Sequence, residues 1–398
     1  MFENGSVCLL NDSFPPLIDG VENAVVNYAK CMTESGIIAT VATPSYPGAD
    51  DESFEFPVIR YSSLNTTRKF GYRLGYPFGK KAVNAIKASN PLLLHSHCPF
   101  SSTLLARMVQ QEVDAPIVFT YHTKFDIEIN KAVEMNFLRK TAKKFLVDNI
   151  SACDEVWVVS KGAGDNLKSL GYQGDCVVME NGVDLKKGLA SPELVAELRQ
   201  KHALPADVPV FLFVGRLMWY KGARIILDGL KMIAKDGKDF RMVFVGDSVE
   251  RPEIEQYAKT LGIQEKCIFV GAVHNRDIIR GYFTLSDLFL FPSSFDTNGI
   301  VVREAAACGK ASVLLRESCA SEGIEDGRTG LLIEETGESM AKCLSFACEN
   351  REKLKVLGQT AMDEIYISWE DAVEKATKRY ELVVENFKSR ETAREKVR

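Results

Sequence analysis

Two cations lie five residues apart in one glycine-bounded segment, Arg216 and Lys221 within residues 215–222. The apolar run 210–214 directly before this segment predicts a buried β-strand. A loop between a strand and a helix suits a diphosphate, because the amides of a helix N-terminus face the anion and glycines let the backbone approach it. Arg216 offers a planar fork of donors, and Lys221 offers a point charge. The alternative for this motif alone is a solvated turn.

Two carboxylates, Asp296 and Glu304, follow a second apolar run. Asp296 belongs to a polar loop, whereas Glu304 lies among small apolar residues that predict a buried helix. Burying a carboxylate without partners is expensive, so we expect Glu304 to accept hydrogen bonds from a ligand, such as the hydroxyls of a ribose. The amides of Gly299, Ile300 and Val301 would begin the helix and face phosphate groups.

Two further loops follow expected strands, and open α/β sheets bind ligands beyond the carboxyl ends of their strands. Gly246 follows the run 242–245, and a glycine permits close approach of the backbone to a ligand. Residues 271–274 follow the run 268–270, and the backbone around Val273 could read the edge of a nucleobase. Taken alone, each loop also fits an ordinary turn.

In combination these motifs resemble glycosyltransferase family 4, retaining enzymes of the GT-B fold, over nearly the whole chain. Each motif alone is modest, but their order and spacing together are specific. The matching elements are Val214-Gly215-Arg216 with Lys221-Gly222, the strand end Phe291-Pro292-Ser293, the pair Asp296 and Glu304, the helix from Glu304-Ala305 to Gly309, and Asn181-Gly182-Val183-Asp184. The chain is similar in particular to bacterial members that glucosylate diacylglycerol.

The resemblance implies a role for each matching position. Arg216 and Lys221 would bind the donor diphosphate and stabilise the leaving group, and Glu304 would hold the ribose. Asp296 would contact hydroxyls of the donor sugar, and residues 299–301 would line the phosphate and the sugar. Transfer would retain configuration through an oxocarbenium-like state. The leaving diphosphate would accept the acceptor's proton, and no metal or other cofactor would be needed.

Two departures from the family pattern concern the donor sugar. Asp296 stands where the family usually has glutamate, and it is one methylene shorter. Tyr220 stands where a second acid often precedes the lysine. The resemblance therefore implies a hexose as the transferred sugar without specifying which hexose it is.

Short apolar runs alternate with amphipathic stretches throughout the chain, which is typical of βαβ units on parallel sheets. The expected strands are continuous apolar runs at 7–10, 37–41, 92–95, 117–121, 156–159 and 177–179, then at 210–214, 242–245, 268–270, 288–291 and 312–315. We expect an α/β fold of two Rossmann-like doubly wound domains, residues 1–185 and 186–368. The resemblance to GT-B enzymes implies that these two domains face a central cleft. A helix over 369–388 is expected to pack back on the first domain, with 389–398 as a flexible tail.

The first domain is expected to supply the acceptor pocket. Gly20 follows the first strand, where related enzymes carry a glycine-rich loop that approaches the donor; an ordinary turn glycine is the alternative. The segment Tyr121-His122-Thr123 resembles the one in members that glucosylate diacylglycerol, whose histidine lies beside the reacting sugar. Asp126 is a further acceptor-site candidate. The segment His95-Ser96-His97-Cys98 lacks a fourth ligand and a recognisable spacing, so no metal site is expected.

Two basic stretches point to lipid as an acceptor. There is no acidic residue between Ile59 and Asn90, and a second basic amphipathic stretch spans 137–146. Such surfaces adsorb to anionic lipid headgroups, with each cation contributing about 1 kcal/mol near the membrane; a solvated basic face is the alternative. The first stretch contains Arg60, Arg68, Lys69, Arg73, Lys80, Lys81 and Lys87, interleaved with Phe70, Tyr72, Tyr76 and Phe78.

The composition restricts the function further. A net charge of −5 argues against a general nucleic-acid-binding protein, because affinity for phosphate comes mainly from Lys and Arg. The ten cysteines include no C-x-x-C pair, which favours a reducing cytosol. No apolar stretch approaches the roughly 20 residues needed to span a bilayer, so membrane contact would be peripheral, on the inner face of the cell membrane.

These expectations favour a glycosyltransferase that moves a hexose from a nucleotide diphosphate sugar, in particular a UDP-sugar, to a membrane lipid such as diacylglycerol. A glycosyltransferase of cell-surface polysaccharide synthesis, with a glycan acceptor, is the nearest alternative. A GT-B-like epimerase would need the same donor site without an acceptor pocket. A non-catalytic nucleotide-sugar-binding protein would bind the donor without reaction.

Overall fold

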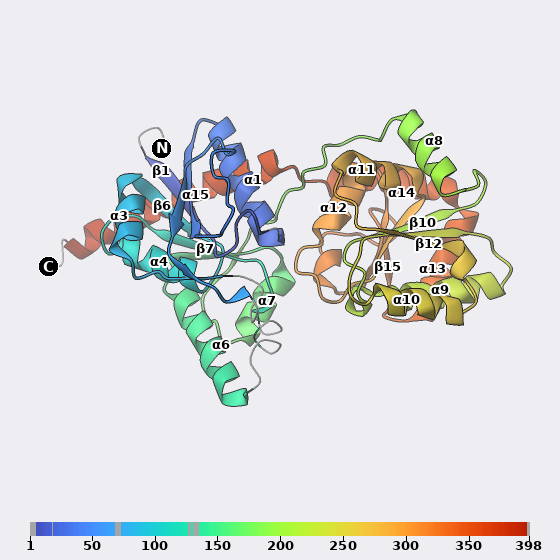
Figure 1. The fold of residues 1–398 in the computed structure, drawn as a ribbon, viewed down its shortest axis with the longest axis horizontal. Coiled ribbons are helices and arrows are strands. Elements are labelled where there is room, and N and C mark those ends of the chain that lie inside the picture. The colour runs from blue at the N-terminus through green and yellow to red at the C-terminus, as the bar shows by residue number, and fades with distance from the viewer. Residues whose placement is uncertain (1–4, 18, 68–72, 126–128, 130–134, 396–398) are drawn as a thin grey trace. The chain divides into compact units, whose positions relative to one another are not determined.

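The computed structural model describes residues 5–17, 19–67, 73–125, 129 and 135–395, and it divides into two compact units (Figure 1). Unit 1 comprises residues 1–181 and 369–398, and unit 2 comprises residues 182–368. The chain therefore leaves unit 1, forms unit 2 and returns to unit 1 with its last helix. The passage between the units falls close to the expected junction at 185 and 186.

Unit 1 is built on a parallel sheet of seven strands in the order β3-β2-β1-β6-β7-β8-β9. These strands are β1 (Ser6–Leu10), β2 (Ile38–Pro44), β3 (Val58–Tyr61), β6 (Pro91–Ser96), β7 (Ile117–Tyr121), β8 (Glu155–Val158) and β9 (Val177–Val178). The main helices are α1 (Gly20–Glu34), α3 (Lys80–Ala88), α4 (Ser101–Gln110), α6 (Asn136–Ser151), α7 (Lys161–Ser169) and α15 (Trp369–Glu395). The short strands β4 (Ser63–Leu64) and β5 (Leu74–Gly75) pair separately.

Unit 2 is built on a parallel sheet of six strands in the order β12-β11-β10-β13-β14-β15. The strands are β10 (Val210–Val214), β11 (Arg241–Val245), β12 (Cys267–Gly271), β13 (Leu288–Phe291), β14 (Ser312–Leu315) and β15 (Leu331–Ile333). The helices are α8 (Pro192–Lys201), α9 (Ala223–Lys235), α10 (Arg251–Thr260), α11 (Arg276–Leu285), α12 (Ile300–Ala307), α13 (Gly337–Glu349) and α14 (Arg351–Glu364). The strand order reverses between β10 and β13, and such a switch point opens a crevice at the carboxyl ends of the strands.

The doubly wound α/β architecture expected from the apolar runs is confirmed in both units. Strands β1, β7 and β10 are buried along their whole length, which explains why their sequences are continuous apolar runs rather than alternating ones. The strands that the runs did not predict are β3, β4, β5 and β15. Arg60 interrupts the apolar run in β3, and the other three strands have only two or three residues each.

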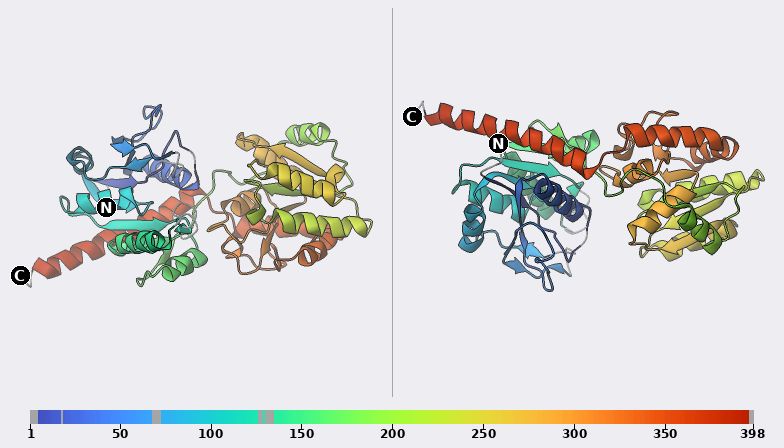
Figure 2. Two further views of the ribbon diagram at one scale, coloured as in Figure 1. Left: turned by 60° about the horizontal axis from the view of Figure 1, so that its bottom comes forward. Right: turned by 90° about the horizontal axis from the view of Figure 1, so that it is seen from above.

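The last helix corrects one expectation. Residues 389–395 continue α15 as helix, whereas their charged composition suggested a flexible tail. Arg390 donates to Asp154 Oδ1 at 3.1 Å, and the Thr392 hydroxyl donates to the Lys388 carbonyl at 2.9 Å. Residues with high helix propensity thus extend a helix that an ion pair already fixes on unit 1. Figure 2 shows α15, in red, running along unit 1, where it packs against α1.

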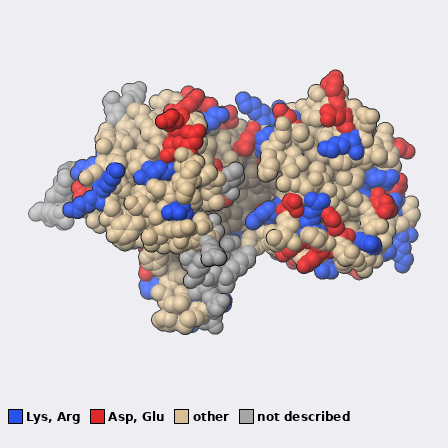
Figure 3. Space-filling model, viewed as in Figure 1, with Lys and Arg blue, Asp and Glu red and all other residues tan. Residues whose placement is uncertain are grey.

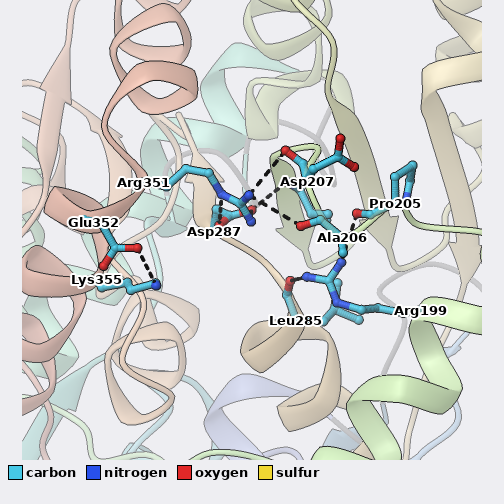
Figure 4. Close-up of polar contacts among 10 residues, drawn as sticks. Arg199, Pro205, Ala206, Asp207, Leu285, Asp287, Arg351, Glu352 and Lys355 are labelled. Carbon is cyan, nitrogen blue, oxygen red and sulfur yellow. Dashed lines mark hydrogen bonds and ion pairs between the residues drawn. The ribbon is translucent and has the colours of Figure 1, made fainter.

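Two arginines fix the amino end of the unit 2 sheet, away from the switch point (Figure 4). Arg351 Nε donates to Asp287 Oδ1 at 2.9 Å, and Asp287 Oδ2 accepts the Val210 amide at 2.8 Å. Arg199 donates to the carbonyls of Pro205 and Leu285 at 3.2 and 3.1 Å. The bonds of Arg351 and Asp287 join α14 to the starts of β10 and β13, and those of Arg199 join α8 to the segment before β10 and to the end of α11. The carboxyl ends of the same two strands can then present their loops at fixed positions.

Candidate active site

Three glycines bring the loops after β10 and β11 and the end of β12 into direct backbone contact. Gly215, Gly246 and Gly271 have positive φ angles of 143°, 139° and 89°. The Gly215 amide donates to the Val245 carbonyl at 3.0 Å, and the Gly246 amide donates to the Gly271 carbonyl at 2.8 Å. A Cβ on Gly246 would lie 1.8 Å from the Gly215 carbonyl oxygen. Bare backbone therefore lines this edge of the sheet.

Lys221 and Asp296 are brought together by a close contact between the loops after β10 and β13. Gly222 has a φ of 85° and caps the start of α9, and a Cβ on Gly222 would lie 2.2 Å from the Pro292 carbonyl oxygen. Lys221 Nζ then lies 2.8 and 2.9 Å from the two carboxylate oxygens of Asp296. Only 12% of the Lys221 side chain and 22% of the Asp296 side chain are exposed.

Neighbouring side chains hold this ion pair in position. Ser293 Oγ donates to Asp296 Oδ2 at 2.7 Å. Lys221 Nζ lies 5.2 Å from the centroid of the Phe291 ring, within the range of a cation–π contact. The ammonium and the carboxylate thus occupy defined positions in the free protein.

Arg216 and Tyr220 share one loop but have different surroundings. Arg216 is exposed, and within the part of the chain that the structure describes no hydrogen bond or ion pair engages its guanidinium. Tyr220 packs on Phe295, with ring centroids 4.6 Å apart. The position where the resemblance suggests an acid therefore forms an apolar contact between the two loops, and Arg216 remains available to an anion.

The start of α12 adds backbone donors to the same edge. Gly299 caps the helix with a φ of 61°, and the Val302 amide donates to the Gly299 carbonyl at 2.8 Å. The amides of Ile300 and Val301 have no acceptor among the described residues. Open amides at a helix N-terminus attract an anion, because the helix dipole is positive there.

Glu304 is buried in α12, and its partner is a residue that the sequence did not point to. Arg276 Nη2 lies 2.5 Å from Glu304 Oε1 and 3.7 Å from Asp184 Oδ2. Burial raises the pKa of Glu304, and the charge of Arg276 lowers it. A signal for Arg276 does exist in the sequence: it lies in the first turn of α11, where the helix dipole disfavours a cation unless an acid compensates.

The nucleobase candidate lies in the loop that leads to Arg276. Val273 is half-buried between β12 and α11 and packs against the core of unit 2, and His274 beside it is exposed. Asn275 caps α11 by accepting the amides of Asp277 and Ile278. The expected donor-site residues of unit 2 thus all lie at or beyond the carboxyl ends of four strands of one sheet.

The candidate site residues of unit 1 have surroundings that differ from one another. Gly20 is the first residue of α1, and Asp19 caps that helix by accepting the amides of Val21 and Glu22 at 2.8 and 2.7 Å. A Cβ on Gly20 would meet no described atom within 4 Å, so packing within unit 1 does not require a glycine there. Asp126 lies outside the described residues.

His122 belongs to a buried group of histidines at the carboxyl ends of β6 and β7. His122 Nε2 lies 2.9 Å from His97 Nδ1. His95 lies between Tyr380 Oη, at 2.5 Å, and Thr120 Oγ1, at 2.7 Å. Burial lowers the pKa of all three histidines, that of His122 to about 3. His122 is therefore a neutral imidazole at neutral pH.

Unit 1 is expected to lose stability as the pH falls below about 6.5. The unfolded chain protonates these histidines there, whereas burial lowers their pKa in the folded state, so the unfolded state binds more protons. Each histidine should reduce the free energy of unfolding by about 1.4 kcal/mol one pH unit below its unfolded pKa. Urea unfolding at several pH values measures this slope, and His97→Asn should make it shallower. An unchanged slope would assign the effect to other groups.

Only part of the basic stretch between Ile59 and Asn90 lies on the surface of the protein. Arg60 is largely buried and pairs with Asp51 at 2.7 Å, so it cannot meet a membrane as expected. Lys87 pairs with Glu112 at 3.2 Å. The exposed members among the described residues are Tyr76, Phe78, Lys80, Lys81 and Lys87, and the residues Arg68, Lys69, Phe70 and Tyr72 lie outside the described part of the chain.

Neither a metal cluster nor a membrane span occurs within the described ranges. No three His, Cys, Asp or Glu side chains there are grouped so that they could hold a metal ion. No helix in those ranges has the length and apolar character needed to cross a membrane.

Two family models match the chain in succession. The model described as Glycosyltransferase Family 4 matches residues 18–187, and the model described as Glycosyl transferases group 1 matches residues 195–364. With the two parallel-sheet units, these matches define a glycosyltransferase of the GT-B fold. The chain belongs to glycosyltransferase family 4.

The names of similar proteins refer to different substrates. Alpha-monoglucosyldiacylglycerol synthase of Acholeplasma laidlawii is 24% identical over 364 residues, which cover 89% of this chain and 90% of that enzyme. The GDP-mannose-dependent alpha-mannosyltransferase of Corynebacterium glutamicum is 24% identical over 332 residues, which cover 82% and 76%. The crystal structure of Anabaena HepE in complex with UDP has a TM-score of 0.75 at 20% identity, covering 94% of this chain and 99% of that chain.

Proposed function

We propose that the protein transfers a hexose from a UDP-sugar to a membrane lipid such as diacylglycerol, with retention of configuration at the anomeric carbon. The observation that supports this most is the convergence of Arg216, Lys221 and the helix start at residues 299–301 on the switch point of unit 2. Two cations and open amides at one edge provide the countercharge that a leaving nucleoside diphosphate requires.

In the proposed reaction, the bond between the anomeric carbon and the diphosphate oxygen breaks first. Arg216, Lys221 and the helix-start amides stabilise the negative charge on the departing oxygen. The acceptor hydroxyl then bonds to the anomeric carbon on the same face, and its proton passes to an oxygen of the leaving diphosphate. The cations serve in place of a metal ion, so the nucleotide sugar is a substrate and no cofactor takes part.

The other residues bind and orient the donor in this proposal. Glu304 accepts the ribose hydroxyls, and the backbone around Val273 contacts the nucleobase. Gly215 and Gly246 let the diphosphate approach the backbone, and Asp296 contacts hydroxyls of the transferred sugar. In unit 1, Gly20 and the neutral imidazole of His122 belong to the donor-sugar side, and Asp126 belongs to the acceptor side. The UDP in the HepE crystal structure supports the choice of nucleotide.

Helix α6 supports a lipid acceptor, as does the similarity to alpha-monoglucosyldiacylglycerol synthase. Exposed apolar side chains gather near its start, with Phe137 exposed by 75%. Lys140 and Lys144 are exposed on the same helix, and Figure 3 shows uncharged surface over most of its visible tip. Apolar side chains flanked by lysines match the interface of an anionic bilayer, and we propose that α6 holds the enzyme peripherally on the inner face of the cell membrane.

Neutralising Lys140 and Lys144 with glutamine should weaken binding to anionic liposomes about thirtyfold, since each cation contributes about 1 kcal/mol at such a surface. Cosedimentation with phosphatidylglycerol-containing vesicles measures the change. The matched control replaces Lys375 and Lys378, two exposed lysines of α15, with glutamine. Equal losses in both variants would mean that α6 is not the membrane surface.

The proposed function is tested by supplying a panel of UDP- and GDP-hexoses with diacylglycerol in anionic vesicles. We expect a glycolipid product with the anomeric configuration of the donor, detected by mass spectrometry and NMR. Transfer only to a soluble glycan would replace the lipid acceptor with a polysaccharide one. Conversion of the UDP-sugar without any acceptor would indicate an epimerase. Donor binding without turnover would indicate a binding protein.

A further inference from the structure

Arg276 connects two acidic residues from separate parts of unit 2. Its Nη2 contacts Glu304 Oε1 of α12 at 2.5 Å, and it lies 3.7 Å from Asp184 Oδ2 in the segment after β9. Glu304 Oε2 has no hydrogen bond within the described residues. One carboxylate oxygen is therefore anchored, and the other is open to a ligand.

We propose that Arg276 is a positioning residue for the nucleotide: it anchors one oxygen of Glu304 so that the other is presented to the ribose hydroxyls. This inference rests on the proposed donor site. It extends that site to Arg276 and to Asp184, which belongs to the Asn181-Gly182-Val183-Asp184 motif and lies 3.7 Å from the same Nη2 atom that contacts Glu304.

Electrostatics supports this role. Burial raises the pKa of Glu304, Arg276 opposes that effect, and the charge of Asp184 adds to it. Without the guanidinium, the charge of Asp184 and the burial of Glu304 would both act without an opposing cation, which favours the protonated form of Glu304. A protonated Glu304 is a weaker acceptor for two hydroxyls. Cys308, which caps the end of α12, does not compete for the cation at neutral pH, because burial raises its pKa to about 11.

One hydrogen-bond donor of the Arg276 guanidinium is not satisfied within the described residues. Arg276 Nε is buried and finds no acceptor within the described part of the chain. A buried donor without an acceptor is costly, so this arrangement is better explained by a ligand site than by stability alone. The residue is accordingly expected to matter more for nucleotide binding than for folding.

The test compares UDP with 2′,3′-dideoxy-UDP by titration calorimetry. Arg276→Met should weaken UDP binding about ten- to a hundredfold and change dideoxy-UDP binding less than about twofold, because the latter lacks both ribose hydroxyls. In an E304Q background, R276M should have little further effect. The control is Arg280→Met on the same helix, whose guanidinium bonds the carbonyls of Lys186 and Gly188 at 2.7 and 2.8 Å. It should keep the preference for UDP.

A pH series separates positioning from mere packing. UDP affinity of R276M should fall as the pH is lowered from about 8 to 5.5, because the unopposed pKa of Glu304 is raised, while the wild type changes less over this range. Arg276→Lys retains a cation and should restore most of the flat profile. It also serves as the folded substitute if R276M is unstable.

Distinct results would overturn each step. Equal losses for UDP and dideoxy-UDP would place Arg276 on another part of the nucleotide, and an unchanged UDP affinity would remove it from the site; either result rejects the inference. A wild-type protein that binds neither nucleotide would reject the proposed function itself.

Discussion

Replacing Lys221 with alanine should lower kcat by about 10²–10³ and leave the fold intact. The ammonium lies beside Asp296 at the point where the loops after β10 and β13 meet, and the loop after β13 leads to the open amides at the start of α12. Its proposed role is to stabilise charge that appears only as the diphosphate leaves, so the loss should fall on kcat more than on KM. Steady-state kinetics with the preferred UDP-hexose measure the two constants. Arg216→Ala should behave similarly.

A structural role for Lys221 can be distinguished from this catalytic one. Lys231→Ala is the matched control, because Lys231 is an exposed lysine of α9 that bonds the Leu261 carbonyl. It should leave kcat unchanged. If Lys221 only orients Asp296, then Lys221→Ala should have no further effect in an Asp296→Asn background. We expect most of the loss to persist there, and near-wild-type turnover of either cation variant would refute the assignment.

Gly246→Ala should reduce the free energy of unfolding of unit 2 by about 3 kcal/mol and abolish detectable UDP binding. The backbone at this position has a φ of 139°, which L-residues rarely adopt, and the new Cβ would lie 1.8 Å from the Gly215 carbonyl oxygen. The loops after β10 and β11 would have to separate. Because Arg216 follows Gly215, the same movement would displace a proposed diphosphate ligand.

Urea unfolding and calorimetry with UDP measure the two effects. Gly262→Ala provides the control, because Gly262 has a φ of 72° and a Cβ there meets no described atom within 4 Å. That variant should show only the strain of a left-handed backbone, about 1 kcal/mol, and normal UDP binding. If the two variants lost equal stability, the close contact between the loops would be irrelevant.

The sequence predicted the strands and the loops of the proposed donor site for one physical reason. Parallel strands covered on both faces must be continuous apolar runs, and the residues after such runs lie at one edge of the sheet. The positions of the apolar runs alone therefore place Lys221 and Asp296 at a common edge, although the two residues are far apart in the sequence. The structure adds the ion pair between them.

Other features were beyond the reach of sequence patterns. Strand β15 has three residues, which are too few to establish a hydrophobic period. In β3 the charged Arg60 interrupts the apolar run, and the sequence does not show that Asp51 neutralises it. The place of Arg276 in the first turn of α11 indicates an acidic partner, but the sequence does not identify that partner, because Glu304 is remote in sequence. Such positions are determined by tertiary contacts, and only a three-dimensional structure shows them.

The path of the chain has a consequence for biosynthesis. Unit 2 is one uninterrupted segment whose ends are joined by a bridge between Val183 and Ser368, so all its residues leave the ribosome before unit 1 is complete. Unit 1 cannot fold completely before α15 has been made, because Tyr380 of that helix contacts His95 and stacks on Trp157 in the core of unit 1. The N-terminal half of the newly made polypeptide thus stays unfinished until α15 has been synthesised, and the unit made second has the first opportunity to fold.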